Sequence, residues 1–295
     1  MKRIFIFFFV FWTFPTSGLE KKLKILLVDT TISVSNYVAS NCCSNCCNQS
    51  KSNQNVTILS IREKNETFDQ TLSNDLKVVN NHKNKDLFFL FEKSKTHADI
   101  MISCINSCAN DVEIFLLPVF NRFGFCNKQI LLNALESIDL QYFHVVLFAG
   151  NILNFDPKHD SLDRQILSYL KKHAFVIVAA GNHGNLNIKK QYQRPFFSYF
   201  FFSIGAFDDW DITKKISIFS SYHNRFKPSF VMPSQHNQSI GTSIAAALFA
   251  GNLIKVISKL QDPKKIQDWC KRNAQKNFEW KNKVRFGCID FKRKM

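Results

Sequence analysis

Apolar residues in this chain follow two patterns, and each pattern predicts a different kind of element. Short continuous or alternating apolar runs predict buried strands at 23–28, 56–61, 113–120, 145–148, 175–179, 200–204 and 216–219. Apolar residues that recur every three or four positions predict helices that begin at His97, at Asn127, at Asp160 or Ser161, and at Ser243. Because strands and helices alternate, we expect an α/β fold with a mostly parallel central sheet and helices on both faces.

The start of the chain has a composition of its own. Met1-Lys2-Arg3 is basic, residues 4–14 are almost all apolar, and residues 15–18 are small or polar. This order is typical of a secretory signal peptide over residues 1–18, and it predicts a secreted, extracytoplasmic protein; a buried amino-terminal strand is the alternative. We expect residues 19–295 to form one domain, and we expect no later run to be long and apolar enough for a membrane helix.

Residues 35–86 are mostly polar and rich in Cys and Asn, and they predict a variable insertion. Four of the nine cysteines lie in the string Cys42-Cys43-Ser44-Asn45-Cys46-Cys47. In an exported protein they predict disulfide bonds, and an odd total leaves at least one free thiol or an intermolecular bridge. The spacing of Cys43 and Cys46 also suits zinc, but no second pair follows nearby at a suitable spacing.

The formal net charge is +16, which has two interpretations. A strongly basic protein is attracted to acidic polymers or anionic surfaces. The other interpretation is a general excess of lysine over the whole surface. Lys and Arg are dispersed along the chain and form no basic stripe, so we favour the second interpretation and expect no nucleic-acid partner. The sequence predicts no particular oligomeric state.

Four short strings carry side chains that suit acyl transfer through a serine ester. Asp29 ends the first predicted strand, His97 begins a helix, Asn182 follows the strand at 175–179, and Ser243 begins a helix. An imidazole exchanges protons near neutral pH, and a buried carboxylate orients its ring. An amide donates to a developing oxyanion, and a serine in a first helical turn lies near unpaired backbone amides. Catalytic groups of α/β proteins gather at the carboxyl ends of parallel strands, so these positions fit the chemistry.

Two of these side chains also have a structural interpretation, and the base has a rival. Ser243 has the residue type of a helix N-cap. Asn182 lies in Gly-Asn-x-Gly, which is common in turns. His183, next to Asn182, is the rival candidate for the base.

The same strings resemble the motifs of the subtilisin-like serine peptidases. Ala179-Ala180-Gly181-Asn182-His183-Gly184 matches that family's Ala-Ala-Gly-Asn-x-Gly, and Gly241-Thr242-Ser243-Ile244-Ala245-Ala246 matches its Gly-Thr-Ser-x-Ala-Ala. Asp29-Thr30-Thr31 is similar to its Asp-(Ser/Thr)-Gly, and His97-Ala98-Asp99 is similar to its His-Gly-Thr. With weaker strings near the carboxyl end, the similarity spans about residues 23 to 292.

The resemblance implies a subtilisin-like three-layer sandwich and a serine endopeptidase that hydrolyses polypeptides. It implies that Asp29, His97 and Ser243 form the catalytic triad and that Asn182 lines the oxyanion hole. The resemblance implies no cofactor. The family often binds calcium, but no loop of this chain is acidic enough for us to assign a calcium site.

The chain departs from the family pattern at Ala247, which replaces the proline after the serine motif, and at three positions near the acid, the base and the substrate. Thr31 and Ala98 replace glycines that follow the acid and the base, and Phe148 lies on the strand edge that normally pairs with substrate. These departures motivate an alternative function, a catalytically impaired pseudopeptidase that binds peptides in the same cleft. A third hypothesis is a basic protein that binds an anionic surface, with the four strings present by coincidence.

Overall fold

The computed structural model describes residues 22–30, 56–59, 96–120, 126–150, 152, 154–186, 194–208, 215–237, 239–275, 277, 280 and 282–291. The predicted signal peptide at 1–18 lies outside the described residues, as do Thr31, the clustered cysteines at 42–47 and most of the predicted insertion at 35–86.

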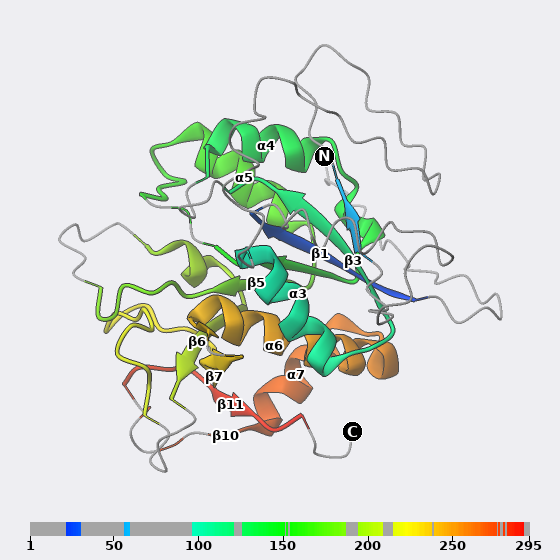
Figure 1. The fold of residues 1–295 in the computed structure, drawn as a ribbon. Coiled ribbons are helices and arrows are strands. Elements are labelled where there is room, and N and C mark those ends of the chain that lie inside the picture. The colour runs from blue at the N-terminus through cyan, green and yellow to red at the C-terminus, as the bar shows by residue number, and fades with distance from the viewer. Residues whose placement is uncertain are drawn as a thin grey trace, which may run out of the picture.

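A nine-stranded sheet forms the centre of the fold (Figure 1). Its strands in spatial order are β10 (Ala274–Gln275), β11 (Gly287–Ile289), β7 (Phe230–Pro233), β6 (Phe202–Phe207), β5 (Val176–Ala179), β4 (Val145–Phe148), β1 (Leu23–Asp29), β3 (Val112–Pro118) and β2 (Val56–Ile58). Every neighbouring pair is parallel except β10 and β11. The predicted α/β class with a mostly parallel sheet is therefore confirmed.

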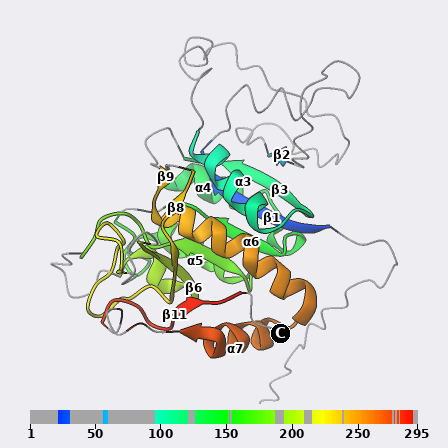
Figure 2. The same ribbon diagram turned by 60° about the horizontal axis from the view of Figure 1, so that its bottom comes forward.

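Helices cover both faces of this sheet, as Figures 1 and 2 show from two directions. On one face lie α3 (His97–Cys108), α6 (Thr242–Leu260) and α7 (Pro263–Asn273). On the other face lie α4 (Lys128–Glu136) and α5 (Ser161–Lys171), together with the 3-10 helices η3 (Leu140–Tyr142) and η4 (Phe196–Tyr199). The layers are thus helices, sheet and helices.

The continuous apolar run of β1 has a direct structural reason. Ile25 and Leu27 pack against the α3 and α6 face, whereas Leu26 and Val28 pack against the α4 and α5 face. Successive side chains of a strand point to opposite faces, so a strand covered on both sides must be apolar at every position.

Helix α6 runs through the core beside α3, β5, β6 and β7. By length and composition it could span a membrane, and 67% of its most apolar stretch is buried in the fold. The expectation that no apolar run after residue 18 has this length was therefore wrong for 242–260. The apolar composition matches the burial of the helix between the sheet and α3. At Gly251 a Cβ atom would lie 2.8 Å from the Ile105 carbonyl oxygen and from Cys108 Cβ, so α3 and α6 touch closely at this point.

The predicted strand at 216–219 was wrong. Ile216 forms a single bridge with Phe207, after which the chain turns, and the Ser220 N–H donates to the Ser217 carbonyl. Ile218 is 92% exposed whereas Ser217 is buried, so the burial is the reverse of what the apolar pattern predicts. The predicted strand at 200–204 is displaced to 202–207, because residues 196–199 form η4.

The side chain of Phe148 is not exposed at the edge of its strand, contrary to the sequence expectation. Its side chain is fully buried on the α4 and α5 face. The ring packs against Phe120 at a centroid distance of 5.4 Å and against Phe196 at 5.0 Å. Phe148 therefore contributes to the core, and it gives no reason to regard the cleft as blocked.

Four cysteines in the described part of the chain are free thiols: Cys104, Cys108, Cys126 and Cys270. Burial raises the pKa of Cys126 and of Cys270 to about 12. Thiols of this kind are poor nucleophiles, since only the thiolate reacts. Disulfide bonds therefore stay a prediction for the cysteines at 42–47.

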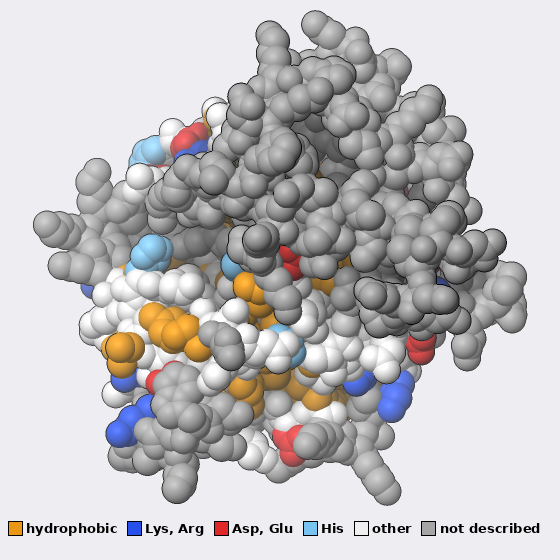
Figure 3. Space-filling model, viewed as in Figure 1, with side chains coloured by type: hydrophobic (Ala, Val, Ile, Leu, Met, Phe, Trp, Pro, Cys, Tyr) orange, Lys and Arg blue, Asp and Glu red, His pale blue; other side chains and the backbone are white. Residues whose placement is uncertain are grey.

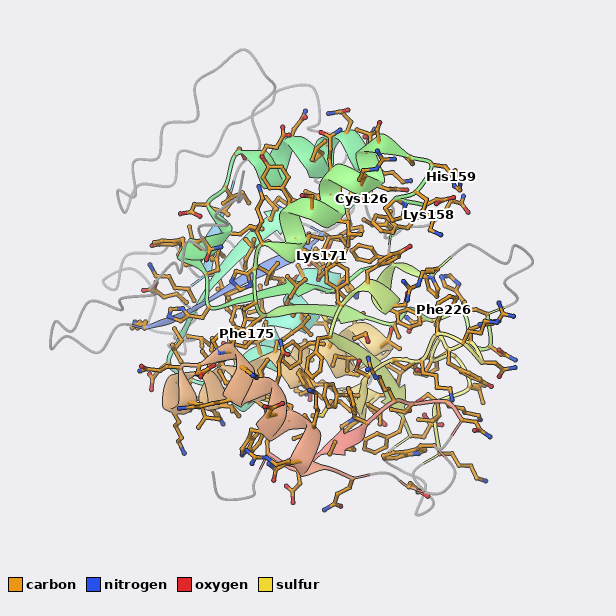
Figure 4. The ribbon with its side chains drawn as sticks, turned by 180° about the vertical axis from the view of Figure 1, so that it is seen from behind. Cys126, Lys158, His159, Lys171, Phe175 and Phe226 are labelled. Carbon is orange, nitrogen blue, oxygen red and sulfur yellow. The ribbon has the colours of Figure 1, made fainter. Side chains whose placement is uncertain are left out.

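An ion-pair cluster joins α4 to the start of α5, on the side of the molecule shown in Figure 4. Lys128 Nζ donates to Asp163 Oδ2 at 2.7 Å and to Asp160 Oδ2 at 3.1 Å. Asp163 is fully buried and also accepts the Asp156 N–H at 2.7 Å. Burial raises the pKa of the Asp163 carboxyl, and the Lys128 ammonium opposes that rise.

Replacing Lys128 by Met is expected to lower the free energy of unfolding by about 3 kcal/mol, because it leaves a buried carboxylate without its cation. Urea denaturation of the wild type and the variant measures the difference. The control is Lys264→Met, which changes an exposed lysine on α7 and is expected to cost little. Equal losses in the two variants would contradict the role of the Lys128 cluster.

His173 is a buried imidazole that bridges two backbone groups. Its Nε2 lies 2.8 Å from the Phe143 carbonyl, to which it donates, and its Nδ1 accepts the Phe175 N–H at 3.1 Å. Only a neutral ring can make both bonds, because protonation removes the acceptor. Burial lowers the pKa of His173 below 6.5, although both backbone contacts raise it.

The stability contributed by neutral His173 should be lost as the pH falls below about 6.5, because the unfolded chain then binds a proton that the folded chain does not. The wild type should therefore lose up to about 1.4 kcal/mol per pH unit more than a His173→Gln variant. Urea denaturation between pH 8 and pH 5 measures both slopes. His159→Gln is the control, because its ring is 73% exposed. A wild-type slope no steeper than that of His173→Gln would refute this role.

Candidate active site

The candidate site lies at the carboxyl ends of the parallel strands, where the strand order reverses. β1 lies between β3 and β4, which follow it in the chain on opposite sides. In open α/β sheets such a reversal leaves a crevice beyond the strand ends. Asp29 is the last residue of β1, so its carboxylate stands at this position.

The Asp29 carboxylate is 2% exposed and has a fixed set of contacts. Its Oδ1 accepts the Thr30 N–H at 2.6 Å and contacts His97 Nδ1 at 2.6 Å. The Thr30 hydroxyl in turn accepts the Ala98 N–H at 3.3 Å. Thr30 thus links the acid to the first turn of the helix that carries the imidazole.

His97 is the first residue of α3, and the local sequence explains why the helix begins there. Thr96 is the N-cap: its hydroxyl accepts the Asp99 N–H at 3.3 Å, while Asp99 Oδ2 accepts the Thr96 N–H at 2.8 Å. This reciprocal pair is a capping box, which satisfies two donors that the helix start leaves open. Ala98 is fully buried and does not displace His97 from its contacts.

Ser243 lies in the first turn of α6. The N-cap of this helix is Gly241, which makes no side-chain cap, so the interpretation of Ser243 as an N-cap was wrong. Ser243 is 7% exposed, and its Oγ lies 2.9 Å from His97 Nε2.

Asp29, His97 and Ser243 therefore form one hydrogen-bonded chain, although 68 and 146 residues separate His97 from the other two. The acid is buried, whereas the His97 side chain is 40% exposed. Burial lowers the pKa of His97, but the charge and hydrogen bond of Asp29 raise it, and the net pKa lies above 6.5. The imidazolium is thus stabilised beside the carboxylate.

Asn182 is held by the residue that precedes Ser243. Its Oδ1 accepts both the Thr242 N–H and the Thr242 hydroxyl at 2.9 Å. The Thr242 hydroxyl also accepts the Gly181 N–H at 3.0 Å. With Oδ1 occupied, the Nδ2 group remains as the donor, and a Cβ on Gly241 would lie 3.4 Å from both Asn182 Nδ2 and Ser243 Oγ. The amide donor and the hydroxyl therefore flank one small space.

Thr30, Asp99 and Thr242 support the site through contacts that were not predicted from the sequence. The capping box of Thr96 and Asp99 has a local signal, a Thr three residues before an acidic residue at a helix start. The contacts of Thr30 and Thr242 join distant segments and have no local signal.

His183, the rival base, has an exposed side chain, and its backbone N–H donates to Ser221 Oγ at 2.9 Å. The imidazole that the structure places at Ser243 is that of His97. Among the described residues, no group of three or more His, Cys, Asp or Glu side chains is arranged to hold a metal ion.

Figure 3 shows a space-filling view of the face on which α3 and α6 lie in front. In its described part, histidine and hydrophobic side chains lie among largely uncharged atoms, and Lys and Arg side chains do not gather into one stripe.

Comparisons with known proteins agree with the observed fold. The structure is similar to a lanthipeptide protease (TM-score 0.61, 13% identity, 92% of this chain and 87% of that chain). It is also similar to the patellamide maturation protease PatA (0.58, 14%, 92% and 94%) and to the prenylagaramide maturation protease PagA (0.57, 13%, 92% and 91%). At these identities the likeness concerns the fold.

No curated protein matches the chain. The model of the subtilase family matches residues 95–288. This range is more than half of the chain and includes His97, Asn182 and Ser243. With this match and the shared fold, the chain belongs to the subtilase family.

Proposed function

We propose that this protein is a serine endopeptidase that hydrolyses peptide bonds through an acyl-enzyme. The observation that carries the proposal is the continuous contact from Asp29 Oδ1 through His97 to Ser243 Oγ, with distances of 2.6 and 2.9 Å. A base within this distance of a hydroxyl can take its proton as the oxygen attacks a carbonyl.

In the proposed acylation, Ser243 Oγ attacks the scissile carbonyl carbon and its proton passes to His97 Nε2. Asp29 holds the Nδ1–H and stabilises the imidazolium. The proton on Nε2 then passes to the leaving amine as the peptide C–N bond breaks. A water molecule, deprotonated by the same imidazole, attacks the ester and releases the acid product with Ser243 restored.

Asn182 Nδ2 and the Ser243 N–H are the proposed donors to the oxyanion. The support for Asn182 is that Thr242 occupies its Oδ1, so the Nδ2 group faces the space next to Ser243 Oγ. An amide donor of this kind contributes about 3–4 kcal/mol to transition-state stabilisation in comparable sites.

The alternative, a pseudopeptidase that only binds peptides, keeps two motivating observations. Thr31 occupies a position where the family has glycine, and it lies outside the described residues. Ala98 occupies a position where the family has glycine. Its buried methyl group is accommodated, however, with His97 still in contact with both partners, and Phe148 lies in the core. Turnover of a mixed peptide library by the purified protein would exclude the alternative.

We also propose that the protein is exported, on the basis of the basic and apolar residues at 1–14. Expression in a secretion-competent host, followed by amino-terminal sequencing, tests this. A mature chain that begins at residue 19 supports export, and a retained Met1 in the cytoplasmic fraction contradicts it.

Wild-type protein is expected to react covalently with a serine-directed fluorophosphonate, and Ser243→Ala is expected to lose the label because the nucleophilic oxygen is gone. Mass spectrometry of the labelled peptide measures this. Ser258→Ala on the same helix serves as a control, since its exposed hydroxyl donates to the Lys255 carbonyl and should leave labelling intact. Equal labelling of wild type and Ser243→Ala would remove Ser243 from the nucleophile role.

Activity is expected to rise with pH through the raised pKa of His97, because only the neutral imidazole accepts the proton of Ser243. In an Asp29→Asn variant, kcat/KM should fall by about 10⁴-fold. The acid limb of the residual activity should move to lower pH, because the carboxylate that raises the pKa of His97 is absent. A pH profile of both proteins checks this, and an unchanged midpoint would refute the electrostatic role of Asp29.

A further inference from the structure

A short hairpin leads directly into the helix that carries Ser243. Its strands β8 (Gln235–His236) and β9 (Ser239–Ile240) pair with each other and stand apart from the main sheet. Figure 2 shows them beside the start of α6, toward α3. A two-stranded ribbon of this size has little stability of its own, so its position depends on contacts with the rest of the fold.

The base of the hairpin is fixed by backbone hydrogen bonds. The Ser234 N–H donates to the Phe207 carbonyl and the Gly241 N–H donates to the Ser234 carbonyl, both at 2.9 Å. Thr242 follows at once, and its N–H and hydroxyl hold Asn182 Oδ1. One residue, Gly241, separates the hairpin from Thr242. A displacement of the hairpin would therefore move Thr242, and with it Asn182 and Ser243.

The far part of the hairpin is fixed to α3 by a side-chain contact. His236 Nε2 lies 3.1 Å from Ser103 Oγ on α3, and 3.1 Å from Asn237 Nδ2 in the turn. An imidazole nitrogen that accepts from both groups carries no proton itself. Ser103 lies six residues after His97 on the same helix, so the contact joins the segment of the nucleophile to the helix of the base.

A second contact, at a greater distance from the site, holds α3 and α6 together. The close approach at Gly251 sets the separation of α6 from Ile105 and Cys108, toward the carboxyl end of α3. Nearer the site, the hydrogen bond between Ser103 and His236 joins α3 to the segment that enters α6. This hydrogen bond therefore limits movement of the hairpin relative to the helix that carries His97.

We infer that Ser103 and His236 are positioning residues, whose hydrogen bond holds hairpin β8–β9 against α3 and so keeps Ser243 and Asn182 aligned with His97. This inference rests on the proposed function, because alignment matters only where Ser243 reacts. A misplacement of about 1 Å by a residue remote from the chemistry can lower a rate by about a hundredfold.

The test compares Ser103→Ala, Ser103→Thr and Ser107→Ala in steady-state peptide hydrolysis. Ser103→Ala is expected to lower kcat by about tenfold or more with KM unchanged, because substrate contacts stay while the alignment is lost. Ser103→Thr keeps the hydroxyl and should restore kcat. Ser107→Ala is the matched control, since the Ser107 hydroxyl donates within α3 to the Cys104 carbonyl.

A double-mutant cycle tests whether the two residues act together. Ser103→Ala combined with His236→Ala should lower kcat no further than either single variant, because both remove the same hydrogen bond. Additive losses, an unchanged kcat in Ser103→Ala, or a raised KM with unchanged kcat would each overturn the inference. The last result would mean that the hairpin contacts substrate instead.

Hydrogen exchange separates this inference from the proposed function. Backbone amides of residues 235–242 should exchange faster in Ser103→Ala than in Ser107→Ala, whether or not the protein is an enzyme. A wild type that neither hydrolyses peptides nor reacts with a fluorophosphonate would refute the proposed function, and with it the positioning role. Faster exchange would then still support the contact as a structural tether, whereas unchanged exchange would refute the tether as well.

Discussion

The close packing of α6 against α3 and the sheet is the constraint on which the site depends. Ser243 and His97 belong to different helices, and 146 residues separate them. Small residues at 245–247 and at Gly251 let α6 approach its neighbours closely, and at Gly251 there is no room for a Cβ. Because packed interiors adapt poorly to extra volume, this contact sets the separation of the two helices at Gly251, and the 2.9 Å distance between the two side chains depends on that separation.

The electrostatics of the site follow from unequal burial. Asp29 is enclosed at the end of β1, where its charge is supported by contacts to Oδ1, while the His97 side chain remains 40% exposed. A buried carboxylate interacts more strongly with an adjacent imidazole than it would in water. The pKa of His97 is therefore raised although burial alone would lower it.

A helix start leaves backbone amides without acceptors, and α3 and α6 supply these acceptors in two different ways. The start of α3 is capped by the side chains of Thr96 and Asp99, so that the helix begins at His97. The N-cap of α6 is Gly241, which has no side chain to accept from the amides that follow, and the Thr242 N–H donates instead to the distant Asn182. Amides in a first helical turn and the positive end of the helix dipole suit a developing negative charge at Ser243.

Sequence alone determined the strands that are buried on both faces and the residue types of the site, because both leave local patterns. The run at 23–28 has to be apolar wherever helices cover both sides of the sheet, and Gly241-Thr242-Ser243 keeps its spacing in any fold. Burial that depends on distant partners was not predictable. From the sequence, residues 216–219 were predicted to form a strand and Phe148 was placed beside the substrate. Their actual burial depends on neighbours that are distant in the chain. Only the tertiary structure decided which imidazole meets Ser243, how Thr242 orients Asn182, and that Ser103 meets His236, since each contact joins segments whose separation along the chain carries no signal of their approach.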